Sequence, residues 1–587
     1  MRLQILLIYL ICIIVSSIVL VESSNKHHFK ENDEVPFYVN NVGPYSNPTE
    51  TYEFYTLPFC KPSSISYKKT KLGEILQGDS AVLSDYQFPF KSSFENKQLC
   101  EYTLKKEDIE KFKKAIGEYY YAEMIYDDLP IFSFVGTVDD SDLTNIRYYL
   151  YNHIPFEFDY NGDQVIRVNI DTEHIKVIEL SDQDEITLKL TYSAKWQPTE
   201  HEFSKRMDLY EEFFTKELEI HWLSVMNSFF LVVLLTAFLA IMIMKILKND
   251  YSRYSKTDEE EDSDYQEDYG WKLVHGDVFR FPPYKNVFSA FYGIGWQFIS
   301  IVCGILALSL FGMFYPNNGG NMYTAGIVLY ALTSGISGYQ SAKMYKNMGG
   351  NKWAWNIVLT ATLFVAPLFI VVILSNTVAI TWHSTVALPI LTMIEVITIW
   401  LFVGFPLTVV GGIAGRRLSE NFEAPCRTKN FPREVPPIQW YRRLPCQILI
   451  AGFLPFSAIY IELFYIFNSV WGHSTYTLYG ILCLVFLILI NVTVCITVAL
   501  TYFQLSMEDH KWWWNSFING GSTVVFIYMY SIYYYYYISH MYGLLQATFY
   551  FTYMLIVCFF FFILLGTVGF YSSLIFVKRI YRNLKSD

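Results

Sequence analysis

Long apolar stretches separated by short polar ones fill the chain from residue 225 to residue 577, whereas residues 25–224 mix charges with short apolar runs. A helix that crosses about 30 Å of hydrocarbon needs about 20 apolar residues. Nine stretches are this long, so the pattern predicts a bundle of nine transmembrane helices. The expected spans are residues 225–247, 291–315, 321–343, 353–375, 384–413, 446–470, 474–502, 516–538 and 547–577.

An earlier apolar run, from Ile5 to Val21, follows Arg2 and precedes Ser23. A basic start, an apolar core and a small residue at the cut are typical of a secretory signal peptide, here residues 1–23. An uncleaved anchor helix is the alternative, because the apolar core is long. Under either interpretation the domain that follows, residues 24–224, is exported.

The exported domain shows the alternation of β-strands. Residues 185–196 place apolar and polar side chains at every second position, and residues 165–170 and 51–55 are similar. A period of two predicts strands with one buried face. One amphipathic helix is expected over residues 105–124. We therefore expect a β-rich, sandwich-like domain.

Two of the nine cysteines, Cys60 and Cys100, lie in this domain. Two thiols in an oxidising compartment, without a third competitor, favour a disulfide. The spacing alone does not establish that their Cα atoms are close.

Charge tests the nine spans independently. The composition, 52% hydrophobic and 17% charged residues, already favours lipid as the solvent of much of the chain. With residues 24–224 exported, every Lys and Arg after residue 224 falls in a loop that faces the cytosol or at its membrane edge. Cytosolic loops are rich in these residues. The pattern predicts a lumenal N-terminus and a cytosolic tail, residues 578–587.

Two carboxylates lie inside predicted spans, Glu395 near the middle of the fifth and Glu462 nearer the lumen in the sixth. Placing an ionisable side chain within a bilayer costs free energy, so such residues usually have a structural or functional role. One hypothesis is a polar site that binds a client helix, a lipid group or a proton. The simpler interpretation is a hydrogen bond between helices, which we favour.

Small residues recur within the spans, and Gly411 and Gly415 have the i, i+4 spacing of closely packed helices. Internal packing is the simpler explanation. A face that docks client helices is the alternative, and the sequence does not separate the two.

Several motifs occur in a fixed order along nearly the whole mature chain. They are residues 52–60 and 72–79, residues 221–224 and 227–228, residues 270–280, residues 454–456 with Glu462, and residues 508–509 with 512–514. Together they resemble the nonaspanin, or transmembrane nine, superfamily. The chain lacks the longer lumenal insertions of the larger members, so it is similar to the shorter subgroup.

The resemblance implies a trafficking role. Similar proteins reside in Golgi and endosomal membranes, help to deliver membrane proteins with glycine-rich spans to the surface, and support adhesion and phagocytosis. The family's C-terminal Lys-x-Asp/Glu signal, read by the coatomer coat, corresponds here to Lys585 and Asp587.

We expect a non-enzymatic sorting receptor without cofactors, whose partners are client membrane proteins, the coatomer coat and the lipid bilayer, and not nucleic acid. The sequence contains none of the common nucleotide-binding, zinc-protease or nucleophile motifs. A transporter or channel that uses Glu395 and Glu462 is the first alternative. A direct adhesion receptor is the second.

Overall fold

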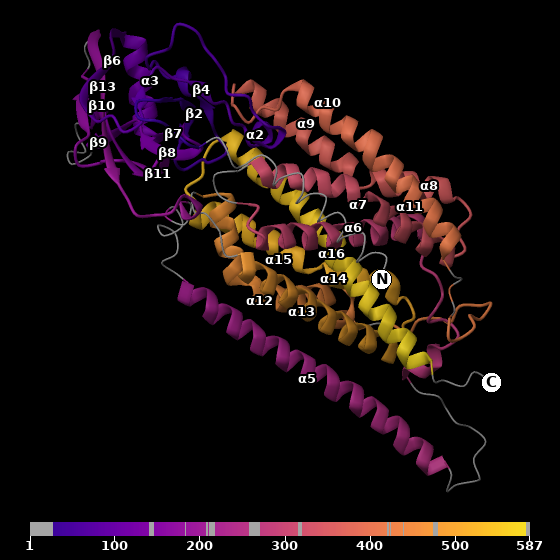
Figure 1. The fold of residues 1–587 in the computed structure, drawn as a ribbon. Coiled ribbons are helices and arrows are strands. Elements are labelled where there is room, and N and C mark those ends of the chain that lie inside the picture. Colours follow the sequence, from indigo (N-terminus) through magenta and orange to yellow (C-terminus); the bar gives the residue numbers. More distant parts are fainter. Residues whose placement is uncertain are drawn as a thin grey trace.

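The computed structural model describes residues 27–139, 146–181, 184–206, 209, 218–257, 270–314, 320–419, 422, 424–437, 439–472 and 479–582. A β-rich N-terminal domain sits at one end of a bundle of long helices (Figure 1). The predicted signal peptide, residues 1–23, and the residues Lys585 and Asp587 lie outside the described residues.

The N-terminal domain contains two main sheets around one apolar core, which confirms the β-rich, sandwich-like prediction. Strand β13 (Glu185–Pro198) shows why: from Glu185 to Trp196, buried side chains alternate with exposed or half-buried ones. The larger sheet has β6 (Phe94–Lys105), β9 (Gly136–Asp139), β10 (Arg147–Asn161), β11 (Gln164–Ile170), β12 (Lys176–Glu179) and β13 (Glu185–Pro198). The smaller sheet has β2 (Phe37–Pro44), β3 (Tyr52–Glu53), β4 (Val82–Leu83), β7 (Tyr120–Tyr126) and β8 (Leu129–Phe134), and β1 (Glu34–Val35) pairs with β5 (Phe88–Pro89).

The predicted helix over residues 105–124 is shorter in the structure. Helix α3 (Lys106–Gly117) ends seven residues earlier than expected, and β7 begins at Tyr120. Tyr119 takes a left-handed conformation with φ 52°, which stops a right-handed helix. The amphipathic stripe of Ile109, Phe112 and Ile116 is buried as predicted.

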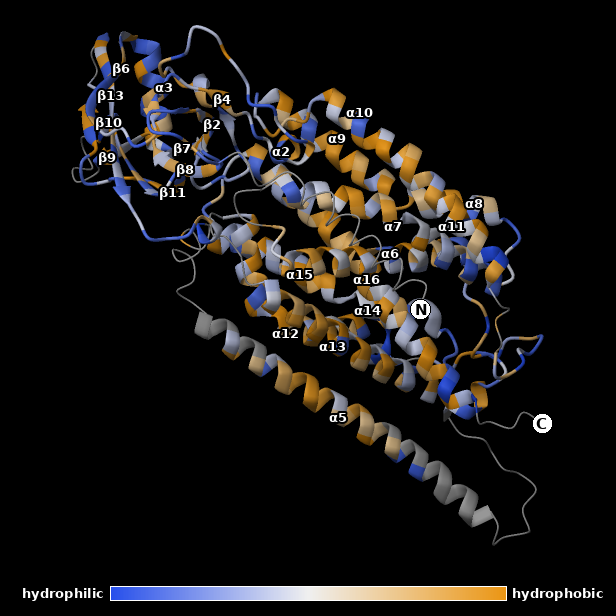
Figure 2. Cartoon of the chain, in the orientation of Figure 1, coloured by the Kyte–Doolittle hydropathy of each residue, from blue (hydrophilic) through white to orange (hydrophobic). Residues whose placement is uncertain are grey.

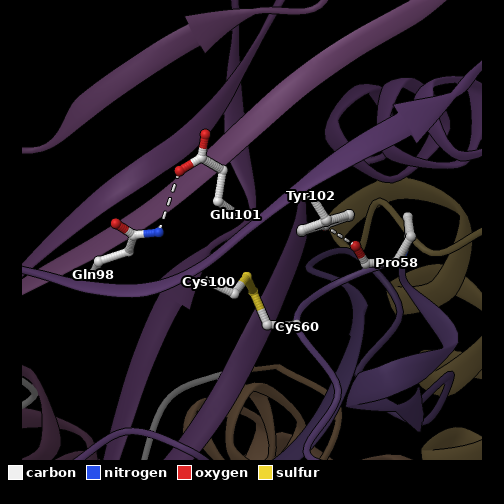
Figure 3. Close-up of a disulfide and its surroundings, with 6 residues drawn as sticks. All are labelled: Pro58, Cys60, Gln98, Cys100, Glu101 and Tyr102. Carbon is white, nitrogen blue, oxygen red and sulfur yellow. Dashed lines mark hydrogen bonds between the residues drawn. A yellow bond between two sulfur atoms is a disulfide. The ribbon is translucent and has the colours of Figure 1, made fainter.

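A disulfide joins Cys60 to Cys100 on β6, with the two Cα atoms 6.3 Å apart (Figure 3). Next to it, the hydroxyl of Tyr102 donates a hydrogen bond to the carbonyl of Pro58. Both contacts tie the segment after β3 to the larger sheet.

Replacing Cys60 and Cys100 together by serine is expected to cost about 4 kcal/mol of unfolding free energy, because the bond closes a loop of 40 residues. Thermal unfolding of the purified protein, with and without reductant, measures this loss. Reductant should lower the unfolding temperature of the wild type and leave that of the double variant unchanged.

Within the described residues, nine helical segments follow the N-terminal domain, and each overlaps one predicted span. Six of them contain a stretch long and apolar enough to cross a membrane: Lys285–Leu310, Trp353–Thr381, Ile390–Leu418, Leu444–Val470, Tyr479–Ser506 and Leu544–Tyr581. In Figure 2, where the ribbon is coloured by residue hydropathy, these helices are mostly orange, the colour of hydrophobic residues. The segments are α5 (Leu218–Thr257), α6 (Lys285–Leu310), α7 (Gly320–Asn347), α8 (Trp353–Thr362) with α9 (Val365–Thr381), α10 (Ile390–Ile399) with η5 (Trp400–Gly404) and α11 (Phe405–Leu418), α12 (Leu444–Val470), α13 (Tyr479–Ser506), α14 (Trp512–Gly521) with α15 (Thr523–Tyr533) and η7 (Tyr534–Ile538), and α16 (Leu544–Tyr581).

Helix α7 packs against α11 through glycines on both helices. A Cβ atom at Gly411 would overlap the backbone carbonyl of Gly335, and one at Gly415 would overlap the carbonyl of Tyr339. The two backbones therefore approach as closely as small residues allow. This geometry places Gly411 and Gly415 in an internal helix contact.

Candidate functional site

The N-terminal domain is bound to the bundle by residues 47–51. The side-chain amide of Asn47 donates to the carbonyl of Tyr542 at 2.8 Å, and the Tyr542 N–H donates back to Asn47 Oδ1 at 3.0 Å. The Thr51 carbonyl accepts bonds from the N–H of Thr385 at 2.9 Å and from the Ser384 hydroxyl at 2.8 Å. These bonds clamp the segment between the start of α16 and the loop that precedes α10.

Helix α2 (Leu72–Gln77) forms a second contact with the bundle. A Cβ atom at Gly73 would overlap the carbonyl of Gly320 at the start of α7. Gly78, which ends α2 with φ 91°, lies against Val386. One of the family-like motifs, residues 72–79, is therefore a docking element between the two parts of the molecule.

Two carboxylates meet one buried amide directly behind this docking element. Asn40, 1% exposed, donates to Asp79 Oδ1 at 3.1 Å and to Glu123 Oε2 at 2.9 Å. Burial, and then the charge of Asp79, raises the pKa of Glu123 to about 7. Burial also raises the pKa of Asp79, against the opposing effects of Asn40 and Lys68. The cluster therefore takes up protons under mildly acidic conditions.

The stability of the protein should depend on the protonation of Glu123. Because its folded-state pKa of about 7 lies above the ordinary value of 4.5, this group contributes most stability below about pH 4.5 and loses it as the pH rises toward 7. The unfolding temperature of the variant Glu123→Gln, relative to that of the wild type, should therefore be higher at about pH 7.5 than at about pH 5.

Glu95→Gln is the matched control, because Glu95 is exposed. The difference in unfolding temperature between Glu95→Gln and the wild type should be the same at both pH values. A pH-independent difference for Glu123→Gln as well would contradict the proton uptake.

A cavity of about 580 Å³ lies in the bundle beneath this docked domain. Residues of the N-terminal domain form its roof, and α12, α13, α15 and α16 form its walls. Volumes of about 300–1,000 Å³ are typical of sites for small ligands. The roof consists of Pro48, Thr49, Thr51, Leu76 and Gln77; the walls include Ile459, Leu463, Phe467, Trp471, Val485, Leu489, Ile527, Phe549, Met554 and Phe561.

Glu462 on α12 lines this cavity and is only 1% exposed. It lies 19 residues after Arg443, which precedes α12, and this corresponds to about 28 Å along a helix. The helix continues for about two further turns beyond Glu462, to Val470. The carboxylate is thus buried in the half of α12 that lies toward the N-terminal domain.

Glu395 is in a different environment. Helix α10 begins at Ile390 rather than at the predicted residue 384, because residues 384–385 bond to Thr51 instead of continuing a helix. This start puts Glu395 in the second turn of the span, and its side chain is exposed. Glu395 therefore lies close to the start of the helical span Ile390–Leu418, and its mid-membrane position stays a prediction.

The two carboxylates are not neighbours. Helices α10 and α12 lie on opposite sides of the bundle (Figure 1). The hypothesis of one polar site shared by Glu395 and Glu462 therefore has no geometric support, and neither does a conduction path that uses both.

At the other end of the bundle, the segment that contains the family-like motif 270–280 packs under the last helix. The indole N–H of Trp512, 0% exposed, donates to the carbonyl of Val278 at 2.8 Å. The Tyr581 hydroxyl donates to the carbonyl of Trp271 at 2.5 Å. These contacts fix the point from which the C-terminal tail leaves the bundle.

Sequence reasoning missed the roof of the cavity. Nothing in the local sequence marks Asn47, which a proline follows, as a contact residue. In the structure its side chain is completely buried at the domain contact. The family-like motif that starts at Tyr52 was the nearest signal, and it begins one residue after the clamped segment.

Comparisons with known proteins agree with this architecture. The family model described as "Endomembrane protein 70" matches residues 51–544. Transmembrane 9 superfamily member 4 of Arabidopsis thaliana is 47% identical and covers 100% of this chain and 99% of its own. Transmembrane 9 superfamily member 1 of Mus musculus is 45% identical over 95% of this chain and 94% of its own. No solved structure matches. The extent of these matches shows that the chain is a multi-pass membrane protein that belongs to the endomembrane protein 70 family, the transmembrane 9 superfamily.

Proposed function

We propose that this protein is a sorting receptor of Golgi and endosomal membranes, which binds the transmembrane helices of other membrane proteins and helps to deliver them to the surface. In cells that engulf particles, this activity supports adhesion and phagocytosis. The N-terminal domain then faces the lumen, and the tail faces the cytosol.

The observation that carries the proposal is the exposure of the span Ile390–Leu418. Only 17% of an apolar stretch of 18 residues in this span is buried, compared with 61% of the corresponding stretch in α6 and 56% in α16. It forms an outer edge of the bundle (Figure 1), while Gly411 and Gly415 hold it firmly against α7. A rigid, apolar helix face of this length supports the docking of a second helix.

A π-helical turn, Trp400–Gly404, interrupts this span. Such turns within α-helices occur frequently at functional sites. Phe402, in the middle of the turn, is 71% exposed. The turn therefore supports placing client recognition on this face.

Photocrosslinking in cells tests the proposal. Phe402 is replaced by p-benzoylphenylalanine, and we expect covalent adducts with other membrane proteins, enriched in glycine-rich spans. Leu487 on α13, 50% exposed, is the matched position away from this face. The same adducts from both positions, or lipid adducts alone, would count against client recognition.

The tail offers a separate test of sorting. Replacing Lys585 and Asp587 by alanine should raise the fraction of the protein at the cell surface, because coatomer would no longer retrieve it. Surface biotinylation measures this fraction. An unchanged fraction would argue against coatomer as a partner, and a wild type found mainly at the surface would favour an adhesion receptor.

A further inference from the structure

We propose that a cavity at the end of the bundle opposite the N-terminal domain binds one phospholipid, with its phosphate on Arg442 and an acyl chain against Phe503. The cavity lies between the start of α12, the end of α13 and the loop that precedes α12 (Figure 1). Its lining includes none of the described residues of the span Ile390–Leu418. The proposal therefore goes beyond the sorting function and does not depend on it.

The cavity has one polar end and one apolar end. Its volume of about 400 Å³ falls within the range of about 300–1,000 Å³ that is typical of sites for small ligands. Gln447 lines it from the first turn of α12, and Ser506 from the last turn of α13. The apolar residues Ile450, Leu500 and Phe503 lie deeper in the two helices. At 1.5 Å per residue, Leu500 is about 9 Å farther from the end of α13 than Ser506. A phospholipid presents its headgroup and its chains in the same order.

The polar end of the cavity has the residues of a membrane surface. Residues 440–443, Trp-Tyr-Arg-Arg, lie directly before α12, and Trp440 is 73% exposed. Aromatic and basic side chains at the end of a span are typical of the interface between membrane and water. Deeper in the helices, Ile450 and Phe503 are 55% and 50% exposed, so they contact lipid in a membrane. A phospholipid can therefore enter the cavity sideways from this leaflet.

Arg442, which lines the cavity, supplies the cation for the phosphate. One nitrogen of its guanidinium lies 2.7 Å from the sulfur of Met507, and the group is 5.3 Å from the ring centre of Tyr441. A thioether is only a weak acceptor, whereas a guanidinium has five N–H donors. Within the described part of the chain, Arg442 forms no ion pair with a carboxylate. Its fork of donors fits the oxygens of a phosphate.

Asp509, the one acid among the described lining residues, already has partners within the protein. Its Oδ2 accepts a hydrogen bond from the side-chain amide of Gln504 at 2.7 Å, and its Oδ1 accepts one from the N–H of Lys511 at 2.9 Å. The residue is only 6% exposed. The guanidinium of Arg442 therefore needs an anion from outside the protein, which a phospholipid provides and a lipid without phosphate does not.

The test uses the full-length protein in nanodiscs that contain a phosphatidic acid probe with a photoactivatable group in its acyl chain. After illumination, we expect labelled peptides that contain Ile450, Leu500 or Phe503. A diacylglycerol probe with the same chains lacks only the phosphate. It should label these positions at least about tenfold less, as expected for the loss of hydrogen bonds between charged groups. Equal labelling by the two probes would overturn the assignment of a phosphate site.

Two neighbouring arginines test the position of the phosphate. Arg442→Gln should reduce labelling by phosphatidic acid at least about tenfold and leave the weak labelling by diacylglycerol unchanged. Arg443→Gln is the matched control, because Arg443 is exposed and does not line the cavity. Salt screens the charge of an exposed side chain, so labelling should stay within about twofold of the wild type. Equal losses for both variants would show a general attraction to positive charge and would overturn the site at Arg442.

Two neighbouring residues of α12 test the cavity itself. Ile450 lines the cavity and Leu449 does not, although both are 55% exposed. Ile450→Trp places a larger side chain at the apolar end of the cavity and should abolish labelling of Leu500 and Phe503. Leu449→Trp should leave this labelling unchanged. Because both positions are exposed, both variants are expected to fold.

The inference fails if Ile450→Trp and the wild type are labelled equally. It also fails if Leu449→Trp loses as much labelling as Ile450→Trp, since the effect would then not depend on the cavity. Neither outcome affects adducts formed at Phe402, so failure of the phospholipid site and failure of the sorting function are distinguishable.

Discussion

Replacing Gly411 by alanine is expected to destabilise the helical bundle, whereas the same replacement at Gly326 is expected to leave it unchanged or slightly more stable. A Cβ atom at position 411 would overlap the backbone carbonyl of Gly335 on α7. Backbone cannot rotate away as a side chain can, so α7 and α11 must separate. We expect a loss near the upper end of the range for overpacked cores, about 1–3 kcal/mol.

Gly326 provides the control because it lies on α7 itself, and nothing is within 4 Å of the position its Cβ would occupy. There alanine brings only its higher helix propensity, up to about 1 kcal/mol. The unfolding temperature of both variants in the same detergent measures the contrast. A similar shift for both would mean that the α7–α11 contact is looser than its glycines indicate.

Replacing Gly73 by alanine is expected to loosen the N-terminal domain from the bundle. The new methyl group would overlap the carbonyl of Gly320, where α2 meets the start of α7. Loosening can be detected at a distance from the substitution, because the hydroxyls of Thr51 and Thr385 are 2.7 Å apart across the same docking interface. A cysteine pair at positions 51 and 385 therefore reports docking through disulfide formation.

In the Thr51→Cys, Thr385→Cys background, we expect rapid oxidation without further change. Adding Gly73→Ala should slow the oxidation, because a cost of about 1–3 kcal/mol lowers the docking equilibrium constant at least about 5-fold. Gly480→Ala, which has nothing within 4 Å of its Cβ, should not alter the crosslinking. Equally rapid crosslinking with Gly73→Ala would show that residues 47–51 hold the domain without α2.

The sequence predicts well those features that depend only on residues close together along the chain. The alternation in residues 185–196 predicts β13, and the amphipathic stripe predicts the buried face of α3. The boundaries were less accurate. Helix α3 ends before β7, and α10 begins after residue 384, because a left-handed Tyr119 and a bond to Thr51 decide those positions. Neither cause is visible in local hydrophobicity.

By itself the sequence determined that this protein has a β-rich N-terminal domain and a set of apolar helices, because periodicity and stretch length are local properties of the chain. The tertiary structure alone decided that Glu462 lines a cavity and that the side chain of Glu395 is exposed. It also decided that Asn47 and Thr51 form the docking contact with the bundle. A cavity is the space left between distant segments, and its position depends on how closely their backbones approach.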